Sequence, residues 1–383
     1  MPRTERVVQG PGAVGRLAAE LDQRGLSRAL VVTGHSVSSS PAFAALMENL
    51  GDRVVSVFSG VKAHNPIAVL MDLIARVGAS KADVLIGIGG GSPIDAAKLA
   101  ALGVAENVSS AEELADFAVH FEYPDIVRIR SLTARPMPTV AIPTTLSAAE
   151  WDGFAGSVDH ERDLKLVTAY AELTPVTVIL DPELASHTPR DLWAQTGVRA
   201  IDHAVEIAYA KNAHPYTTWL ANGALSILAR NLPASASDPE NYDAALQCQI
   251  AAWMSITGVH NVSLGLSHAI GHQLGALGIP HGVTSCIMLP HVMRFLEPVT
   301  QEQQASMAAV LAEVQGDGED ASAADRIERL IDELGVPRRV SDYGIPADKM
   351  AGVASAALGD IVVRESPRKV DEKVIYELLE TVW

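Results

Sequence analysis

The order of apolar runs along the chain is the feature that most constrains its fold. In the first half, the short β-rich runs ALVVT (29–33), RVVSVF (53–58) and DVLIGI (83–88) alternate with amphipathic segments such as FAALMENLG and IAVLMDLIARVG. Apolar strands separated by segments of helical length are typical of βαβ units and a parallel sheet. We expect TVAIP (139–143), LKLVT (164–168) and PVTVIL, which ends before Asp181, to continue that sheet.

The second half of the chain has a different pattern. After about residue 182 strand-like runs nearly vanish, and long segments with apolar residues at helical spacing follow, such as LWAQTGVRAIDHAVEIAYA and TTWLANGALSILARNL. A chain of 383 residues is also longer than one ordinary core requires. We therefore predict a parallel-sheet α/β domain at 1–182 and an all-helical domain at 183–383, with the boundary near DPELASHTPRDL, where turn formers cluster.

Composition and charge exclude several classes of protein. The net charge of -17 argues against nucleic acid and against an anionic membrane surface, because both need a basic face. Two cysteines, Cys248 and Cys286, are too few for a disulfide framework or a cysteine-built zinc site, and they fit a reducing cytoplasm. The segment MPRTERVVQGPG lacks the apolar region of a signal peptide, and no apolar run reaches membrane-spanning length. We expect a cytoplasmic protein with a small-molecule ligand.

A glycine run marks the first candidate binding site. GIGGGSPIDAAKLAAL (87–102) follows a predicted strand and opens a predicted helix. Gly89, Gly90 and Gly91 would let backbone N–H groups approach a phosphate, at the positive end of the helix dipole. Ser92 could cap the helix, and Pro93 suits its first turn. The spacing is not GxGxxG, and the alternative is a glycine turn that only links strand to helix.

Two further strand ends belong to the same prediction. IPTTLSAAE (142–150) brings the hydroxyl groups of Thr144, Thr145 and Ser147 to the edge of the sheet where parallel α/β domains bind ligands. Two polar loops at one edge favour a dinucleotide over a lone phosphate. The strand in VVTGHS ends at Gly34, where an acid often binds the adenosine ribose of NAD. No carboxylate there would repel a 2′-phosphate, although Gly34 could also be a simple turn residue.

Histidines cluster in the helical half. In GLSHAIGHQLGALGIPHG (265–282), His268 and His272 are four residues apart and lie on one helix face, and His281 follows after a loop. With His203 from an earlier helix, three or four imidazoles could converge. A single histidine on an apolar helix is more often a hydrogen-bonded core residue, but the pair together with His281 favours a shared site.

The ordered motifs GGGSPIDAAK, IPTT…AE, TG…HAVE, GLSHAIGHQLGA…PHG and LPHVMRF resemble the iron-containing alcohol dehydrogenase superfamily, including its maleylacetate reductase branch. The resemblance covers nearly the whole chain. It implies a Rossmann-like nucleotide-binding domain followed by a helical metal-site domain, the dehydroquinate synthase-like architecture, with a catalytic cleft between them. It also implies hydride transfer from NADPH or NADH, and we expect a homodimer.

The resemblance assigns roles to individual residues. The residues that match the pyrophosphate loop are Gly89, Gly90, Gly91, Ser92 and Asp95. The residues that match the second cofactor loop are Thr144, Thr145 and Ser147, and Lys165 falls where the family has a cofactor-facing lysine. The three histidine ligands of the metal match His203, His268 and His281, and His272 matches an additional histidine near the nicotinamide.

This chain departs from the family pattern at the metal site. Metal-using members have an aspartate four residues before the first ligand histidine, and this chain has Arg199 there. Asp202 lies about 100° away round the helix and cannot simply replace it. Maleylacetate reductases have asparagine at that position and are regarded as metal-independent. The loop TTLSAAE has the shorter length of that branch, and His64 in AHNP resembles one of its histidines.

The arginine sets the expectation about metal. A guanidinium about 6 Å from a divalent cation would cost roughly 5 kcal/mol at an effective dielectric constant near 20. It does not deprotonate in proteins. If Arg199 points into the site, we expect no metal, and Arg199 could stabilise a developing oxyanion or clamp a carboxylate while His272 or His268 supplies a proton. Alternatively, Arg199 pairs with Asp202 or Glu206 and points away.

Three functions are compatible with these patterns. The first is an NAD(P)H-dependent, metal-independent reductase of a small carboxylate-bearing ketone or enone, like maleylacetate reductase, in which Arg199, His203, His268, His272 and His281 form the catalytic site. The second is an alcohol dehydrogenase that holds iron or zinc with His203, His268 and His281, with water as the fourth ligand. The third is a non-catalytic nucleotide-binding protein, which the retention of all four histidines disfavours.

Overall fold

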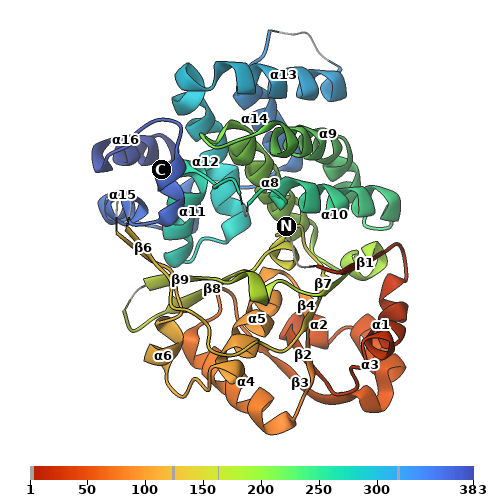
Figure 1. Cartoon of the computed structure of the whole chain (residues 1–383). Helices are drawn as coiled ribbons and strands as arrows, with labels where there is room; N and C mark the ends of the chain where they lie inside the picture. The colour runs from red at the N-terminus through yellow and green to blue at the C-terminus, as the bar shows by residue number, and fades with distance from the viewer. Residues whose placement is uncertain (1–3, 123–125, 163, 260, 317–319) are drawn as a thin grey trace. The chain divides into compact units, whose positions relative to one another are not determined.

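The computed structural model describes residues 4–122, 126–162, 164–259, 261–316 and 320–383 (Figure 1). The chain divides into two compact units, Met1–His120 with Arg128–His187, and Phe121–Val127 with Thr188–Trp383. The division after His187 falls within the turn-rich segment DPELASHTPRDL. In the described residues, no helix is both long and apolar enough to span a membrane.

The first unit is built on a sheet of six parallel strands in the order β1-β10-β7-β4-β2-β3. The strands of this sheet are β1 (Arg6–Gln9), β2 (Ala29–Gly34), β3 (Val54–Val61), β4 (Val84–Gly89), β7 (Thr139–Pro143) and β10 (Thr177–Leu180). The central register pairs Ile86 of β4 with Val31 of β2 and with Val140 of β7. The predicted fold class of this half is confirmed.

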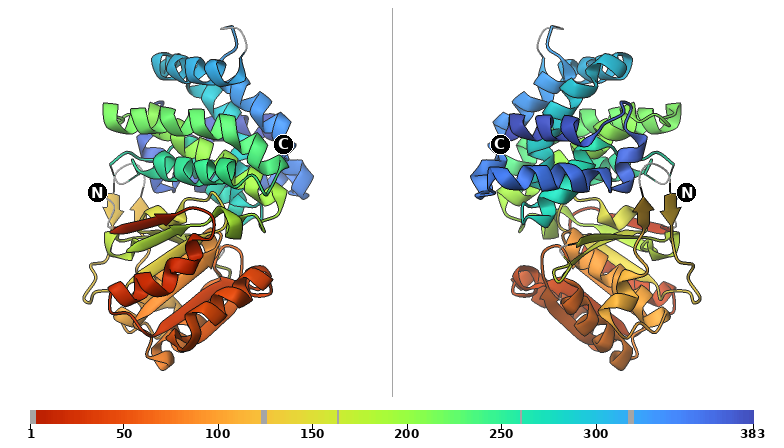
Figure 2. Two further views of the ribbon diagram at one scale, coloured as in Figure 1. Left: turned by 90° about the vertical axis from the view of Figure 1, so that its right-hand side faces the viewer. Right: turned by 90° about the vertical axis from the view of Figure 1, so that its left-hand side faces the viewer.

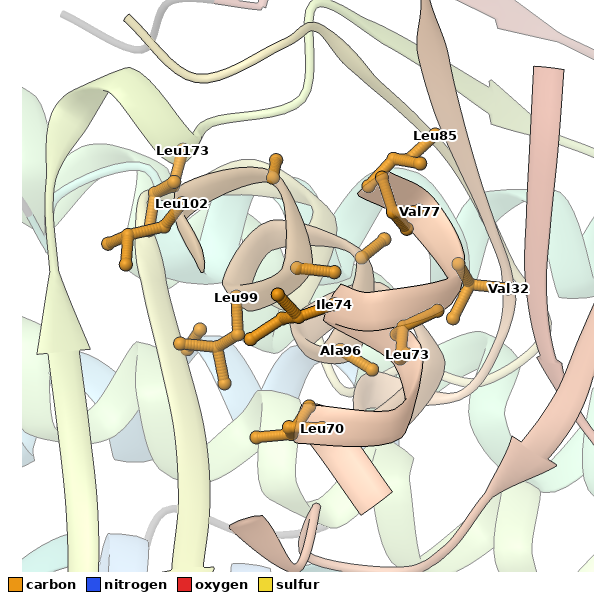
Figure 3. Close-up of a cluster of buried hydrophobic side chains, with 14 of the residues drawn as sticks. Val32, Leu70, Leu73, Ile74, Val77, Leu85, Ala96, Leu99, Leu102 and Leu173 are labelled. Carbon is orange, nitrogen blue, oxygen red and sulfur yellow. The ribbon is translucent and has the colours of Figure 1, made fainter. Parts of the chain in front are cut away.

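Helices cover both faces of this sheet, and side-chain alternation along the strands explains why. Leu30, Val32 and Leu85 contact one apolar cluster, and Val31 and Ile86 contact the other, as the two-residue period of a strand requires. The first cluster lies under α4 (Ile67–Ser80) and α5 (Gly91–Ala105), as Figure 3 shows, and the second under α1 (Leu17–Gln23) and α3 (Pro41–Leu50). Figure 2 shows these two pairs of helices on opposite sides of the sheet. The remaining short helices of this unit are α2 (His35–Ser38), α6 (Ala111–Ala115) and α7 (Pro182–Ala185).

A glycine in β4 lets the first turn of α5 lie directly against the sheet. A Cβ atom added at Gly87 would come within 3.0 Å of the Cα atom of Ile94. This distance is shorter than ordinary van der Waals contact, and backbone atoms cannot move aside cheaply. Gly87 therefore fixes the position of the first turn of α5 against β4, at the end of the strand where the glycine run begins.

One predicted strand does not join the main sheet. LKLVT forms β9 (Leu164–Ala169), which pairs antiparallel with β8 (Phe154–Asp159) in a separate two-stranded sheet. The expectation that it continues the parallel sheet was wrong. The physical reason is burial: Leu164 at the start of β9 is exposed, whereas every residue of β10 and β7 is buried, as strands covered on both faces require.

The second unit is helical. Its helices are α8 (Arg190–Tyr209), α9 (Pro215–Ser237), α10 (Tyr242–Ile256), α11 (Leu266–Ala276), α12 (His281–Leu296), α13 (Gln301–Gln315), α14 (Ala323–Leu334), α15 (Met350–Leu358) and α16 (Glu372–Val382). The described part of 200–380 contains no strand, as predicted. Two short strands, β5 (His120–Glu122) and β6 (Ile126–Arg128), pair with each other, and most of their residues belong to this unit.

The helix α8 lies in the middle of the second unit and packs against α9, α10 and α12 (Figure 1). Its residues from Thr196 to Tyr209 are all buried, so its polar side chains must find partners inside the protein. Glycines let the neighbours of α8 approach closely: a Cβ atom at Gly271 of α11 would lie 2.7 Å from Thr284 Oγ1 of α12, and one at Gly282 would lie 2.8 Å from the backbone of Gln195. The polar residues of α8 are thereby pressed against α11 and α12.

Candidate active site

The glycine run of the first unit forms the turn from β4 into α5. Gly89 has a φ of 136°, which only glycine adopts readily, and Gly90 precedes the first helical residue, Gly91. No side chain caps this helix, so its first N–H groups are available to an anion. The expectation that Ser92 caps α5 was wrong, because the helix begins one residue before Ser92.

The strand order places this turn at the point where α/β sheets bind ligands. The chain leaves β2 toward β3 on one side, whereas it leaves β4 toward β7 on the other side. Such a reversal opens a crevice beyond the carboxyl ends of the two central strands. Gly34 ends β2 and Gly89 ends β4, so both residues lie at this position.

The second predicted loop lies directly beside the first. The backbone N–H of Thr144 donates to the carbonyl of Gly89 at 2.8 Å. A Cβ atom at Gly90 would lie 3.3 Å from Thr145, and one at Gly91 would lie 3.2 Å from Ser147 Oγ. The two loops that sequence placed at one edge of the sheet are therefore in contact, and the glycines leave the space that their hydroxyl-bearing neighbours fill.

Asp95 has a different environment from that of a phosphate ligand. Its Oδ2 accepts the backbone N–H of Gly156 in β8 at 3.0 Å, and Lys98 lies 3.7 Å from its other oxygen. Burial raises the pKa of Asp95 to about 6, opposed by the positive charges of Lys98 and Lys165. Asp95 thus ties the first turn of α5 to β8, and Lys165 of β9 lies close enough for its charge to act on this carboxylate.

The fully buried Lys98 completes this polar anchor. Its Nζ donates to the carbonyls of Ala149 at 2.5 Å and Phe154 at 2.7 Å, and it lies 3.2 Å from Asp152. These bonds hold the second loop against α5. Sequence reasoning missed Lys98, although its position one turn after Asp95 in the motif GGGSPIDAAK was a usable signal.

His64 lies in a turn beside the strand pair β8 and β9. His64 and Asn65 both have positive φ values, 62° and 53°, which are uncommon for residues other than glycine. Asn65 is buried and donates from Nδ2 to the carbonyl of Gly156 at 3.1 Å, which holds this turn in place. Burial lowers the pKa of His64, and the charges of Lys165 and His160 lower it further, so His64 and Lys165 lie close to each other.

Arg199 is the central residue of the second unit's polar cluster. Its side chain is 8% exposed, and its Nη1 donates to Ser285 Oγ of α12 at 3.1 Å. A Cβ atom at Gly271 of α11 would lie 3.6 Å from the same nitrogen. The guanidinium therefore lies between α8, α11 and α12. Among the described residues it makes no ion pair with a carboxylate, so the alternative in which Arg199 pairs with Asp202 or Glu206 and points away is not observed.

The four predicted histidines lie in one chain of ring contacts. The ring centroids of His203 and His268 are 4.9 Å apart, those of His268 and His272 are 6.2 Å apart, and those of His272 and His281 are 5.9 Å apart. Burial lowers the pKa of His203 and of His268 well below 6.5, and in both the charge of Arg199 is the next cause. Arg199 and these imidazoles therefore share one site, and the two buried rings are neutral.

Two acids that sequence reasoning did not place in the site surround His268. Glu206 Oε2 lies 2.7 Å from His268 Nδ1 and also accepts the backbone N–H of Gly265, while Oε1 accepts that of Ser267. Asp202 accepts the hydroxyl of Ser267 at 2.9 Å. Burial raises the pKa of Asp202 to about 6 and that of Glu206 well above 4.5, and the charge of Asp202 raises the Glu206 value further. The spacing of Asp202 and Glu206, one helical turn apart, was the available signal.

His272 has an acidic partner from a distant part of the sequence. Its Nδ1 lies 2.7 Å from Oδ2 of Asp360, which directly precedes a short 3-10 helix, Ile361–Glu365, that contacts α11. No motif in the sequence indicated this residue. It is separated from His272 by 88 positions, and its surroundings in the sequence are unremarkable.

The group of possible metal ligands that the structure brings together differs from the set that the resemblance assigns. The described histidine, cysteine and acidic residues contain one group whose ligand atoms all lie within 4.8 Å of one another, and that group is Asp202, Glu206 and His268 rather than the three histidines. Several donors of this group are engaged with each other, with Ser267 and with backbone N–H groups, whereas Asp202 Oδ1 and His268 Nε2 are buried without a hydrogen-bond partner among the described residues. The fourth ligand position carries Arg199, a cation.

Comparison with known proteins identifies relatives along the whole chain. Residues 4–182 match the family described as iron-containing alcohol dehydrogenase, and residues 193–383 match the C-terminal region of the Fe-containing alcohol dehydrogenase family. The lactaldehyde reductase of Escherichia coli strain K12 is 32% identical over 98% of this chain and 97% of its own length.

Solved structures also superpose along nearly the whole chain. A 1,3-propanediol oxidoreductase superposes with a TM-score of 0.88 at 27% identity, covering 99% of this chain and 98% of its own. The maleylacetate reductase of Agrobacterium tumefaciens superposes with a TM-score of 0.81 at 25% identity, covering 100% of this chain and 97% of its own.

The loop at 142–150 contains a buried acid, and we expect its protonation to affect stability. Glu150 is 1% exposed, and burial raises its pKa to about 8 from an ordinary value of 4.5. Between pH 4.5 and pH 8 the folded protein keeps this proton while the unfolded chain loses it, so this contribution to stability falls as pH rises. The Glu150→Gln variant removes the titrating group. As measured by urea unfolding, the free energy of unfolding of this variant should rise relative to that of the wild type between pH 5 and pH 8. Glu48→Gln, on the exposed face of α3, is the control. If the free energies of unfolding of Glu150→Gln and wild type differ by the same amount at every pH, Glu150 does not have the raised pKa.

Proposed function

The chain belongs to the iron-containing alcohol dehydrogenase family and is an oxidoreductase, and on this premise we propose that it reduces a small ketone or enone that bears a carboxylate, using NADPH or NADH and no metal. Maleylacetate reductase is one named activity among the similar structures that fits this proposal. The protein would hold the coenzyme phosphates with the glycine turn Gly89–Gly91 and the loop that carries Thr144, Thr145 and Ser147.

The buried guanidinium of Arg199 is the observation that carries this proposal. It is fixed to Ser285, and it lowers the pKa of His203 and His268 by its charge. Burial lowers the pKa of Arg199 itself, but arginine stays protonated in proteins. A fixed positive charge at this point would repel a divalent cation and attract an anionic substrate group or a developing oxyanion.

The proposed reaction follows from these residues. When bound, the reduced coenzyme would supply a hydride to the carbonyl carbon or to the enone, and negative charge would develop on the substrate oxygen. Arg199 stabilises that charge by hydrogen bonds, or it clamps the substrate carboxylate bidentately. His272, which is 15% exposed whereas the ring of His268 is fully buried, is the proton donor that we favour.

A metal-dependent alcohol dehydrogenase is the second candidate. The specific observation in its favour is that His203 Nδ1 and His268 Nε2 are buried and make no hydrogen bond within the described chain. Buried imidazole nitrogens of this kind are suitable ligands for iron or zinc. In this candidate, His203, His268 and His281 would bind the ion, and Arg199 would have to turn away from it.

Metal content and the Arg199→Asp variant separate the two candidates. We expect wild-type protein, purified without chelator, to contain substoichiometric iron and zinc by plasma mass spectrometry and to stay active in EDTA. Arg199→Asp supplies the missing anionic ligand and should increase metal affinity. It should also lower kcat/KM for oxocarboxylates by roughly 10- to 100-fold, while neutral aldehydes are affected less, because it removes a charged hydrogen-bond donor.

Arg190→Asp is the matched control for this experiment, because Arg190 is an exposed residue at the start of the same helix. It should change neither metal content nor substrate preference. If the wild type instead holds one tightly bound metal per chain, and chelation abolishes activity reversibly, Arg199 does not replace the metal and the second candidate is correct.

Coenzyme preference depends on Gly34 in our proposal. Gly34 has an ordinary extended backbone, with φ -93°, and a Cβ atom there would meet only the carbonyl of Val61 at 3.8 Å. Glycine is therefore not required by the turn, and its effect is to leave room and remove charge. We expect NADPH to be used at least comparably to NADH.

The Gly34→Asp variant tests this interpretation. The added carboxylate should lower kcat/KM for NADPH by roughly 10-fold or more through repulsion of the 2′-phosphate, and it should leave NADH use nearly unchanged. Gly78→Asp, which adds the same charge where a Cβ atom meets nothing within 4 Å, is the control. A wild-type enzyme that already prefers NADH by about a hundredfold would show that Gly34 does not act in this way.

A further inference from the structure

The pair formed by His272 and Asp360 is not part of any motif, and we infer that Asp360 is a positioning residue that orients His272 for proton donation to the substrate. This inference rests on the proposed function, in which His272 supplies the proton. It adds a residue from the C-terminal segment to a site otherwise built from α8, α11 and α12.

The carboxylate of Asp360 is held at both oxygens. Oδ2 lies 2.7 Å from His272 Nδ1, and Oδ1 accepts the backbone N–H of Val362 at 3.1 Å, at the start of the 3-10 helix Ile361–Glu365. The side chain is 8% exposed, so little water competes for these bonds. The bond to Val362 fixes the carboxylate, and the carboxylate in turn fixes the plane of the imidazole ring.

A carboxylate next to Nδ1 also selects the proton position on His272. A carboxylate only accepts hydrogen bonds, so Nδ1 keeps its proton and donates it to Asp360. The other ring nitrogen, Nε2, is then the atom that exchanges a proton with substrate. This division is consistent with exposure: the side chain of His272 is partly exposed, whereas that of His268 is fully buried.

The proton and electron balance of the step is simple. The reduced coenzyme, when bound, would supply the hydride with its two electrons, and the carbonyl carbon that receives it would be reduced. The imidazolium of His272 gives the Nε2 proton to the resulting oxyanion and becomes neutral imidazole. Its remaining proton stays on Nδ1, bonded to Asp360, and solvent returns the lost proton before the next turnover.

A purely structural role for Asp360 is the alternative. In that case the carboxylate only caps the 3-10 helix and links it to α11. The Asp360→Asn variant distinguishes the two roles, because asparagine is an equally good cap and its Oδ1 can still accept from Val362. Its amide nitrogen would then face Nδ1 and donate to it. His272 would be forced to carry its proton on Nε2. It could not also be protonated on Nδ1, because that N–H would then point at the amide N–H of the variant side chain.

We therefore expect Asp360→Asn to lower kcat by roughly 10²- to 10⁴-fold, the range seen when an acid that orients a catalytic histidine is replaced by its amide. KM and the Kd for the coenzyme should change by less than about 3-fold, and Tm should change little, since the cap is kept. Asp371→Asn is the matched control. Asp371 also caps a helix, accepting from Val374 at 2.9 Å at the start of α16, and its variant should keep wild-type kcat.

Asp360→Ser is the second variant, because serine can cap Val362 but is too short to replace the carboxylate at His272. It should show the same loss of kcat, so the inference stays testable even if the asparagine variant folds poorly. In a His272→Ala background, Asp360→Asn should cause far less additional loss than in the wild-type background, since the inferred role of Asp360 is exerted through His272.

The failures of the inference and of the proposed function differ. Full activity of both Asp360 variants, with His272→Ala inactive, would overturn only the role of Asp360. Losses from His272→Ala and Asp360→Asn that multiply in the double variant would also overturn it. Full activity of His272→Ala would instead remove His272 as proton donor, which is part of the proposed function itself.

Discussion

The buried positive charge of Arg199 is the constraint on which the rest of the helical unit depends. A guanidinium that is 8% exposed loses most of its hydration, and one hydroxyl, that of Ser285, does not replace it. Two acids supply the compensation: the charges of Asp202 and Glu206 favour the protonated arginine, and Asp360 contributes as well. Burial lowers the pKa of His203 and of His268, and the same charge lowers both further. An arginine, three acids and four imidazoles are therefore one electrostatic unit, in which no member can change without affecting the others.

The glycines make this unit possible. Gly271 and Gly275 lie one turn apart on α11, and Cβ atoms there would collide with Thr284 and with the ring of His281. Because Gly271 and Gly275 have no Cβ atoms, α12 can approach closely enough for Ser285 to reach Arg199. In the first unit, Gly87, Gly90 and Gly91 have the same effect on α5 and the second loop. In both units, removing side chains from the backbone is what brings the polar groups together.

Much of the fold was predictable from sequence, because the alternation of apolar strands and helices, and its end near residue 182, are strong local signals. LKLVT shows the limit: its composition indicates a strand, but only burial shows that β9 pairs with β8 outside the main sheet. At the site, short helical spacings link Arg199 to His203 and His268 to His272, and the family resemblance joined these pairs with His281. Asp360 could not be found, since its contact with His272 exists only after α11 and the C-terminal segment have packed. Glu206 was visible as one turn from Asp202, but its bonds to Gly265 and Ser267 depend on the loop before α11.

In the proposed function, the fixed guanidinium of Arg199 takes the place of a metal ion in this member of the family. Anomalous diffraction tests it most directly, with crystals grown without chelator from protein produced in medium supplemented with iron and zinc, and soaked with NADPH. Data collected on both sides of the iron and zinc absorption edges should show no anomalous peak among His203, His268 and His281, with Arg199 still bonded to Ser285. A full-occupancy peak about 2.0–2.1 Å from the imidazole nitrogens, with Arg199 turned away from it, would contradict the claim.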